Sequence, residues 1–351
     1  MSDVKGIDQQ RVADWMVANT PPVEPPLTFD LIAGGRSNLT YRVTDSAGRA
    51  MVLRRPPVSH VLATAHDMGR EHTIISALYG SAVPVPKAVG FCADTEVNGA
   101  PFYVMDFVDG HILQSAEQVE SLWDEATQRS AADNLVDGLV ALHGTDPDSV
   151  GLGDLGKKED YVGRQLRRWY GQFQSSQEQA REGGVFREAD IVHEVHDELV
   201  ARKPAQLEAV IAHGDYRLDN CIFATDGTLA AVLDWELCTL GDPLADLATM
   251  MVYYSERGDG GYSLSAASTA PGFPTRAELA ARYAEKSGRD TTLVPYYAAF
   301  AHWRLACIME GVYVRYASGA MGDEHDGATG LADEVVRRCG LARDSLALLD
   351  T

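Results

Sequence analysis

The pattern of apolar and polar positions divides the chain into three segments, beginning with a helix. Residues 7–19, "IDQQRVADWMVAN", carry apolar side chains at helical spacing. The following "TPPVEPP" favours extended polyproline geometry, because proline restricts the backbone to that region. Segment 1–26 is therefore interpreted as an appended helix and a stiff connector.

Residues 27–108 are dominated by strand signals. Short runs rich in β-branched and aromatic residues are separated by turn signals at "DSAG" and "VNGA". The predicted strands are "LTFDLIA", "LTYRVTD", "AMVLRR", "KAVGFCA" and "PFYVMDFV". One predicted helix, at about residues 65–79, interrupts them. This segment should form a small β-rich lobe.

Helical spacing dominates the third segment, residues 109–351. Capping boxes, in which Ser or Thr precedes Gln or Glu by three positions, mark helix starts at Ser115 and Thr275. Three short strands are expected, "AVIAH", "CIFAT" and "LAAVLD", and the last two are joined by a hairpin signal at Asp226-Gly227. The predicted fold class is α+β, with a small β-rich lobe joined by a short strand to a larger helical lobe.

Composition restricts the possible partners. The 351 residues are 45% hydrophobic, enough for a large core, and 51 acidic against 30 basic residues give a net charge of −21. This charge opposes binding to nucleic acid or to anionic membranes, so neither is expected as a partner. The five scattered cysteines, odd in number and without a CxxC pair, are interpreted as reduced core thiols. Without a signal-like start or a long apolar run, the predicted location is cytoplasmic.

Polar residues interrupt a strand-like run in "IAHGDYRLDNCIF". A kinase-like catalytic loop requires an aspartate that accepts a hydroxyl proton, an asparagine five positions later for magnesium, and a second metal-binding aspartate after a hairpin. Asp215, Asn220 and Asp234 have this spacing. Each residue alone could cap a helix or fix a turn, but the combined spacing favours phosphoryl-transfer chemistry.

At these residues the sequence resembles the aminoglycoside phosphotransferase family, which includes choline kinase-like enzymes. The matching motifs are "HGDYRLDN", "VLDWE" and "GDPLADLA". The resemblance implies that Asp215 is the catalytic base, that Asn220 and Asp234 bind magnesium, and that His213 braces the loop. For Asp242 and Asp246, a role limited to capping and bracing the following helix is an equal alternative.

The nucleotide-binding residues are expected in the β-rich lobe. In "IAGGRSNLTYRV", Gly34 and Gly35 carry no Cβ, so backbone amides could approach ATP phosphates, although an ordinary hairpin turn is an alternative. Ser37 and Asn38 are the expected phosphate neighbours. The linking strand should bring Met105, Asp106 and Phe107 to the adenine edge.

In the third predicted strand, "MVLR" aligns Arg54 with the phosphate-binding lysine of kinases. Arginine keeps the charge, but its planar guanidinium group is not equivalent to a compact ammonium group. The expected partner is Glu71, for which a solvated helix face is the alternative. An arginine in place of the usual lysine also raises the alternative of a nucleotide-binding pseudokinase without transferase activity.

The arginine, with "FYVMDFVDG", "RQLRRWY" and "HWRLACIMEGVYVR", is similar to the subgroup of kinase-like domains fused to acyl-CoA dehydrogenases. The resemblance extends from about Leu27 to Gly319. It implies a hydroxylated acyl-CoA thioester as the small-molecule acceptor and a functional link to an acyl-CoA dehydrogenase.

Basic residues mark a candidate acceptor face. Arg164, Arg167 and Arg168 fall on one helical face, where they could hold an anionic acceptor or pair with neighbouring carboxylates. Arg304 and Arg315 leave the same two alternatives. An aminoglycoside or other antibiotic acceptor remains open, because a polycation would suit the acidic chain. A protein substrate is disfavoured, since no activation segment ending in APE follows Asp234.

The resulting prediction is an ATP- and magnesium-dependent small-molecule kinase. GTP is not excluded as the phosphoryl donor, and the oligomeric state stays open. A hydrolase metal site at His213, Asp215 and Asp234 is disfavoured, because one histidine without an HxH or HExxH partner is a poor ligand set.

Overall fold

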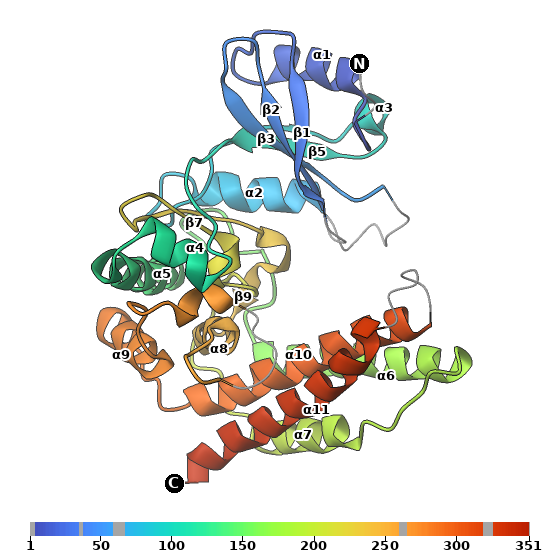
Figure 1. Ribbon diagram of the computed structural model, residues 1–351, viewed down its shortest axis with the longest axis vertical. Coiled ribbons are helices and arrows are strands. Elements are labelled where there is room, and N and C mark those ends of the chain that lie inside the picture. Colours follow the sequence, from blue (N-terminus) through green and yellow to red (C-terminus); the bar gives the residue numbers. More distant parts are fainter. Residues whose placement is uncertain (1–3, 35–37, 59–66, 260–264, 319–325, 351) are drawn as a thin grey trace.

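A computed structural model describes residues 4–34, 38–58, 67–259, 265–318 and 326–350. Figure 1 shows two lobes, a small one built around a sheet and a larger one composed mainly of helices. The predicted α+β bilobal fold is therefore confirmed. Within the described ranges, no helix combines the length and apolar character needed to cross a membrane.

The small lobe contains the five predicted strands in one antiparallel sheet. Its strand order is β1-β2-β3-β5-β4. The strands are β1 (Thr28–Gly34), β2 (Leu39–Thr44), β3 (Ala50–Arg55), β4 (Ala88–Cys92) and β5 (Phe102–Asp106). In β3, Arg54 lies opposite Thr40 of β2 and Tyr103 of β5. This register places Arg54 in the middle of the sheet.

Alternation along the strands gives the sheet two different faces. Met51 and Leu53 lie on the outer face, in a core shared with Val12 and Met16 of α1 (Gln9–Asn19). Side chains at the intervening strand positions, such as Val52, lie on the other face and join a core that includes α2 (Met68–Leu78). Helix α2 lies between the sheet and the larger lobe (Figure 1). The segment before residue 27 is thus packed into the small lobe.

Both helices begin at side chains that cap free backbone N–H groups. Asp8 accepts a hydrogen bond from the backbone N–H of Arg11, and Asp67 accepts one from that of Arg70. A short helix, α3 (Thr95–Asn98), replaces part of the turn predicted at "VNGA". Its N-cap is Asp94, whose carboxylate accepts from the Glu96 N–H, so a local hydrogen bond converts the turn into one helical turn.

The larger lobe is organised around α10, which is buried over most of its length. This helix packs against α6, α7, α8 and α11. The helices of this lobe are α4 (Ala116–Leu122), α5 (Glu125–Gly144), α6 (Tyr161–Glu182), α7 (Asp190–Ala201), α8 (Pro243–Tyr253), α9 (Arg276–Ser287), α10 (Val294–Ala317) and α11 (Asp326–Ala347). The reciprocal capping box predicted at Thr275 is confirmed. At Ser115 only half of the predicted box forms, because the Ser115 side chain accepts from the Gln118 N–H. The Gln118 side chain instead accepts from the backbone N–H of Gln114.

Two short antiparallel pairs lie between these helices. The predicted hairpin of β7 (Cys221–Phe223) and β8 (Leu229–Val232) forms, with Gly227 in the left-handed region at φ +81°. Strand β6 (Val210–Ala212) pairs with β9 (Thr239–Gly241), a strand that was not predicted. Three residues are too few to show strand periodicity, so pairing with β6 decides this conformation. All five cysteines are buried free thiols, as predicted.

Candidate active site

The loop that follows β6 is held by one buried carboxylate. Asp246 of α8 accepts hydrogen bonds from the backbone N–H groups of His213, at 2.5 Å, and Gly214, at 2.8 Å. Burial alone would raise the pKa of Asp246, but hydrogen bonding and the charge of His143 lower it, so the carboxylate stays ionised. Gly214 has φ +84°, and a Cβ there would lie 2.8 Å from the Leu237 carbonyl oxygen. The loop therefore requires both glycine and Asp246.

The side chain of His213 connects this loop to the end of the hairpin. Its Nε2 lies 2.9 Å from the Leu233 carbonyl oxygen, and its Nδ1 accepts from the Asp215 N–H at 3.3 Å. The predicted bracing role of His213 is confirmed. Asp242 caps α8 by accepting from the Leu244 N–H at 3.0 Å. Capping and bracing thus account for the observed contacts of Asp242 and Asp246.

Asp215 and Asn220 lie side by side. The amide Nδ2 of Asn220 donates to Oδ2 of Asp215 at 2.9 Å, and Nε of Arg217 donates to the same oxygen at 3.1 Å. Among the described residues, Oδ1 of Asp215 has no hydrogen-bond partner. The Asn220 carbonyl accepts from the Leu233 N–H at 2.8 Å, which brings the residue before Asp234 to the same place. Sequence spacing correctly placed these three residues in one site.

Asp234 has an unusual backbone conformation. It follows β8 and adopts φ +64°, a left-handed value that costs energy for a residue other than glycine. The conformation turns the chain from β8 into the short helical turn at Trp235–Leu237. Its side chain makes a 2.5 Å ion pair with Nη2 of Arg54 across the two lobes.

Arg54 links the two carboxylates that surround it. Its Nε lies 3.4 Å from Oε2 of Glu71, and the Tyr103 hydroxyl donates to the same oxygen at 2.8 Å. Burial alone would lower the pKa of Arg54, but Tyr103, Glu71 and Asp234 raise it overall. Glu71 is 1% exposed, so the alternative of a solvated helix face is wrong. Its pairing with Arg54, expected from the resemblance, is observed.

A third carboxylate, Glu236, completes an acidic cluster. Oxygen atoms of Glu71, Asp234 and Glu236 lie within 4.8 Å of one another, and Asn38 Nδ2 donates to Glu236 at 3.3 Å. Burial, together with the charge of Asp234, raises the pKa of Glu236 to about 7. Glu236 was not among the residues predicted for the site, although it occurs in the "VLDWE" motif, two positions after Asp234.

The composition of this cluster suits a hard cation. Magnesium prefers oxygen ligands, and carboxylates dominate the cluster. Two oxygen atoms beside it, Asn38 Oδ1 and Glu71 Oε1, are buried without a hydrogen-bond partner in the described part of the chain. A bound cation would also offset the repulsion that raises the pKa of Glu236. The residues present therefore fit Mg²⁺.

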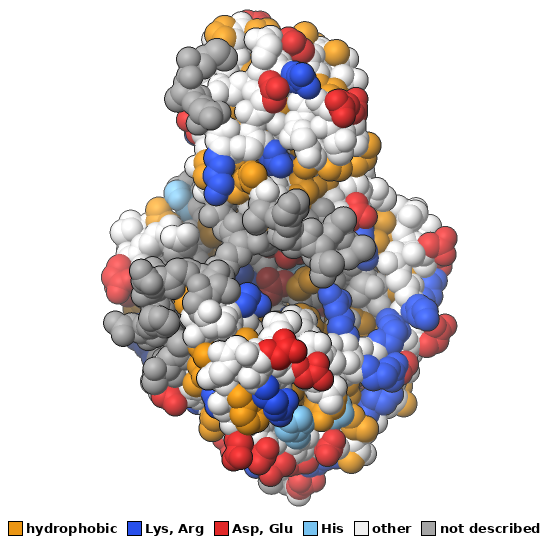
Figure 2. Space-filling view, turned by 90° about the vertical axis from the view of Figure 1, so that its right-hand side faces the viewer, with side chains coloured by type: hydrophobic (Ala, Val, Ile, Leu, Met, Phe, Trp, Pro, Cys, Tyr) orange, Lys and Arg blue, Asp and Glu red, His pale blue; other side chains and the backbone are white. Residues whose placement is uncertain are grey.

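A cavity of about 510 Å³ between the lobes contains most of the predicted nucleotide residues. Asn38, Arg54, Met105, Phe107 and Asp106 line it, as do the following residues of the larger lobe: Asp219, Asn220, Leu233 and Asp234. Figure 2 shows the surface hollowed between the lobes, with acidic side chains inside. Gly35 and Ser37 lie outside the described residues.

Apolar side chains line the same cavity beside the linking strand. Ile32, Val52, Ile75 and Ile222 join Met105 and Phe107 there, and none of these four was singled out from the sequence. The Asp106 N–H donates to the Lys87 carbonyl at 2.8 Å, so this amide is already used by the protein. The cavity thus has an apolar part beside β5 and a charged part beside Asp234.

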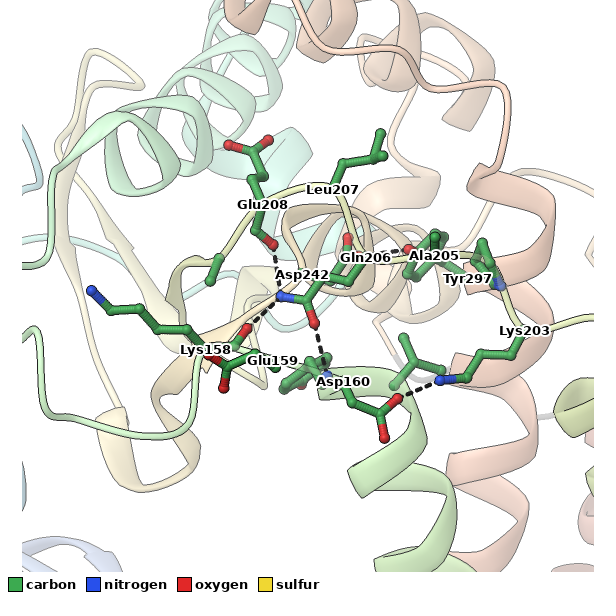
Figure 3. A pocket seen from close by; sticks show the side chains of 14 residues that line it. Lys158, Glu159, Asp160, Lys203, Ala205, Gln206, Leu207, Glu208, Asp242 and Tyr297 are labelled. Carbon is green, nitrogen blue, oxygen red and sulfur yellow. Dashed lines mark hydrogen bonds and ion pairs between the residues drawn. The ribbon is translucent and has the colours of Figure 1, made fainter.

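A second cavity, of about 530 Å³, lies within the larger lobe (Figure 3). Gln206 crosses it, donating to the carbonyl oxygens of Lys158 and Glu208 and accepting from the Tyr161 N–H. Lys203 pairs with Asp160 at its rim. These polar groups form hydrogen bonds and ion pairs with one another. Neither Asp215 nor Asn220 nor Asp234 lines this cavity, so it is not the candidate active site.

The arginines of the predicted acceptor face differ in their partners. Arg167 pairs with Asp160 at 3.1 Å, so the alternative of carboxylate pairing holds for this residue. Arg164 donates to the Lys157 carbonyl at 2.7 Å, and Arg168 lies 5.3 Å from the Trp169 ring. Neither forms an ion pair with a carboxylate among the described residues.

Arg304 is the most deeply buried of the arginines considered for the acceptor face. It is 6% exposed, and its Nη2 donates to the Gly214 carbonyl at 2.9 Å. Its guanidinium group lies 5.8 Å from the Trp169 ring. This contact places a buried cation one residue away from Asp215.

A two-lobed fold with Asn220 and Asp234 lining its cleft, and Asp215 hydrogen-bonded to Asn220, defines the class as a kinase-like phosphotransferase. The sequence profile of the Phosphotransferase enzyme family, APH, matches residues 28–291. The chain belongs to this family, which confirms the resemblance inferred from its motifs.

Relatives with longer chains share the sequence. Acyl-CoA dehydrogenase family member 11 of Gallus gallus is 33% identical over 298 residues, covering 82% of this chain and 36% of that protein. Acyl-CoA dehydrogenase family member 10 of Mus musculus is 33% identical over 316 residues, covering 86% and 27% respectively. The chain therefore spans about a third of the length of these curated relatives.

Solved structures share the fold. A candidate aminoglycoside phosphotransferase from Ralstonia eutropha has a TM-score of 0.78 and 29% identity, covering 98% of each chain. An aminoglycoside phosphotransferase in ternary complex with streptomycin and ATP has a TM-score of 0.62 and 13% identity, covering 97% of this chain and 99% of that one. Plasmodium vivax ethanolamine kinase has a TM-score of 0.58 and 16% identity, covering 91% and 84%.

Proposed function

We propose that the protein transfers the γ-phosphoryl group of ATP, with Mg²⁺, to a hydroxyl group of a small molecule. The observation that carries this proposal is the position of Asp215. One of its carboxylate oxygens is held by Asn220 and Arg217, while the other has no partner among the described residues. An oriented carboxylate oxygen beside metal-binding residues is the arrangement that accepts a hydroxyl proton during phosphoryl transfer.

The donor nucleotide would occupy the cavity between the lobes. Met105, Phe107 and Ile222 supply apolar surface for a purine base, and Asn38 and Arg54 supply polar groups for its phosphates. Arg54 has two carboxylate neighbours, so its position is already fixed before a nucleotide arrives. The proposal takes ATP as the donor, and the same apolar surface is compatible with GTP.

The metal would be held by Asn220 and Asp234, with Glu236 beside them. When bound, Mg²⁺ would neutralise charge on the phosphate oxygens and orient them for transfer. Asp234 presents one oxygen to Arg54, so its second oxygen would serve the metal. Arg54 and the metal would thus use different atoms of one carboxylate.

The proposed acceptor is a hydroxyacyl compound, with a hydroxyacyl-CoA as the leading candidate. This extension rests on the relatives named as acyl-CoA dehydrogenases and on Arg168 and Arg304, which have no carboxylate partner in the described part of the chain. It also implies a functional link to an acyl-CoA dehydrogenase. A polycationic antibiotic is less compatible with the acceptor-side arginines, because like charges in a partly buried site repel.

The experiment that tests the function combines single-turnover ADP formation with nucleotide titration of the Asp215→Asn variant. We expect nucleotide affinity to stay close to wild type, because nucleotide binding does not need a base. Turnover should fall by roughly 10²- to 10⁴-fold, the usual contribution of a positioned acid or base.

Asp226→Asn is a suitable control, since this exposed aspartate lies in the hairpin turn, where it accepts from the Thr228 N–H. Wild-type turnover in Asp215→Asn would exclude that residue from the chemistry. Absence of ADP formation by the wild type with every hydroxyl acceptor would favour a nucleotide-binding pseudokinase instead.

A further inference from the structure

Arg70 connects a helix of the small lobe to the larger lobe. It lies in the first turn of α2, and its Nη2 donates to the carbonyl oxygens of Leu155, at 3.1 Å, and Cys238, at 2.6 Å. These carbonyls belong to separate segments of the larger lobe: Leu155 lies between α5 and α6, and Cys238 lies just before β9. The two hydrogen bonds, which we call the Arg70 clamp, tie α2 to the lobe that it faces (Figure 1).

One of these segments carries two acidic residues of the candidate active site. Cys238 comes four positions after Asp234 and two after Glu236. They are connected by the short helical turn at Trp235–Leu237, whose last hydrogen bond is donated by the Cys238 N–H. The Arg70 clamp therefore fixes the position of α2 relative to both carboxylates.

The next residue of α2 is Glu71, which contacts the sheet. Successive positions of an α-helix point about 100° apart, so Arg70 and Glu71 project in different directions from one turn. Oε2 of Glu71 lies 3.4 Å from Nε of Arg54, while Arg70 reaches the larger lobe. A shift of α2 that breaks one of these contacts also moves the other.

Glu71 is held close to groups of the same charge. Its carboxylate lies in the acidic cluster, within 4.8 Å of oxygen atoms of Asp234 and Glu236. The charge of Arg54 offsets part of the repulsion. The remainder favours a movement of α2 away from the larger lobe, and the Arg70 clamp opposes that movement.

The Arg70 clamp differs from two other side-chain contacts between the lobes. Those contacts, made by Arg54 and Asn38, end at carboxylates of the acidic cluster, where a metal ion or phosphate would compete for the same groups. Arg70 instead bonds backbone carbonyls, and neither Arg70 nor its two partners line the cavity between the lobes. The clamp can therefore persist while the site binds and releases its ligands.

We propose that Arg70 is a positioning residue, which clamps α2 to the larger lobe and so holds Glu71 at Arg54 for nucleotide binding. This inference rests on the proposed function. Without the clamp, repulsion separates α2 from the larger lobe. Arg54 then loses either Glu71, which lies on α2, or Asp234, which lies on the larger lobe. The loss falls on the binding of Mg-ATP, because these groups hold the phosphates and the metal.

Calorimetric titration with Mg-ATP measures this effect without requiring a known acceptor. Arg70→Met should raise the Kd by about tenfold, the lower end of the range for hydrogen bonds to a charged group. Arg70→Lys, which keeps the charge on a shorter side chain, should raise it less. A variant that is only destabilised would show fewer binding sites per chain at an unchanged Kd, and that result would overturn the inference.

A double variant tests whether Arg70 acts through Glu71. Glu71→Met removes the carboxylate and should weaken binding by itself. Adding Arg70→Met should then weaken it little further, because the contact with Arg54 is already lost. If the two losses multiply instead, Arg70 does not act through Glu71 and the inference is wrong.

Arg11→Met is the matched control. Arg11 also projects from a small-lobe helix and donates to a distant carbonyl, that of Glu96 at 2.7 Å, so its loss should leave the Kd unchanged. An unchanged Kd in Arg70→Met would overturn the inference but not the proposed function, whereas a wild type that binds no Mg-ATP would contradict the proposed function. In that case, or if Arg70→Met does not fold, hydrogen exchange of α2 in Arg70→Lys decides. Faster exchange than in wild type supports the clamp, and equal exchange overturns it.

Discussion

The buried arginines on the two sides of the candidate active site have opposite electrostatic surroundings. On the nucleotide side, Arg54 lies between Glu71 and Asp234, and a third carboxylate is close by. On the acceptor side, Arg304 is at least as deeply buried but has no carboxylate partner among the described residues. The first side has excess negative charge, which suits a metal ion. On the second side, Arg304 is a cation without a carboxylate partner in the described ranges, which suits an electron-rich acceptor.

The comparison shows that net charge is a poor guide to a site. A chain with charge −21 would be expected to attract cations everywhere, yet Arg164, Arg168 and Arg304 have no carboxylate partner among the described residues. Figure 2 shows Lys and Arg side chains on the lower rim of the hollow between the lobes. Local pairing, rather than the total, therefore decides which ligand a surface favours.

Removing the central cation of the nucleotide side should have the largest effect on stability. Arg54→Met would leave Glu71 buried beside Asp234 without a compensating charge. We expect the free energy of unfolding to fall by about 3–5 kcal/mol, the usual cost of breaking a buried ion pair. Urea denaturation of the nucleotide-free protein measures this change.

The double variant Arg54→Met, Glu71→Gln is the control for that measurement. It removes the stranded carboxylate as well, so it should be more stable than Arg54→Met alone. Equal stability of the two variants would show that the ion pair does not organise the nucleotide side.

Loss of a metal ligand should have the second-largest effect, on the affinity for Mg-ATP. Asp234→Asn should weaken Mg-ATP binding by about 100-fold, because a ligand of the metal and a partner of Arg54 are both lost. Binding of metal-free ATP should not weaken, since a negative charge near the phosphates is removed. Calorimetry with and without Mg²⁺ distinguishes these effects. A variant with unchanged metal-dependent affinity would refute the assigned metal site.

The pH dependence of stability should reveal the excess negative charge. Glu236 has an ordinary pKa near 4.5, raised to about 7 in the folded protein by burial and Asp234. The folded state therefore keeps a proton that the unfolded state loses. The free energy of unfolding should fall as pH rises from about 4.5 to 7, by about 1–2 kcal/mol after allowance for partial exposure.

Glu236→Gln isolates this contribution, because glutamine cannot titrate. The difference in unfolding free energy between wild type and variant should change through that pH interval in the absence of Mg²⁺. A difference that stays constant from pH 4.5 to 7 would mean that Glu236 does not carry the raised pKa.

The smallest effects are expected for substitutions of the α6 arginines, and their sizes should distinguish Arg167, which is paired with a carboxylate, from Arg164 and Arg168. Replacing Arg164 and Arg168 together by Gln should raise the KM for an anionic acceptor by about tenfold, while leaving the KM for ATP unchanged. Arg167→Gln should change either value less than about twofold, because exposed ion pairs contribute little. Equal effects of the paired and unpaired arginines would remove the distinction drawn between them.

The sequence predicted those parts of the molecule that depend on local spacing. Asp215, Asn220 and Asp234 could be predicted to lie near one another because a loop and a hairpin of defined length fix their separation. The Asp226-Gly227 turn likewise specifies its hairpin by backbone preference alone. The α+β fold followed from the change between strand and helical patterns.

Features that depend on distant contacts could not be predicted in the same way. The ion pair between Arg54 and Asp234 joins residues 180 positions apart, and its geometry depends on how the lobes meet. Strand β9 exists because β6 is beside it. Among the residues that the structure describes, Arg304 has no carboxylate partner, and because this is a property of its folded surroundings, the sequence left its role open.

The two hydrogen bonds that Asp246 accepts have a consequence for hydrogen exchange. The amide protons of His213 and Gly214 are both bound to a carboxylate on a buried helix. They can exchange with solvent only when that helix and the loop separate. Exchange at these two amides should therefore require opening of the larger lobe's core, and it should be as slow in the empty protein as in the presence of nucleotide.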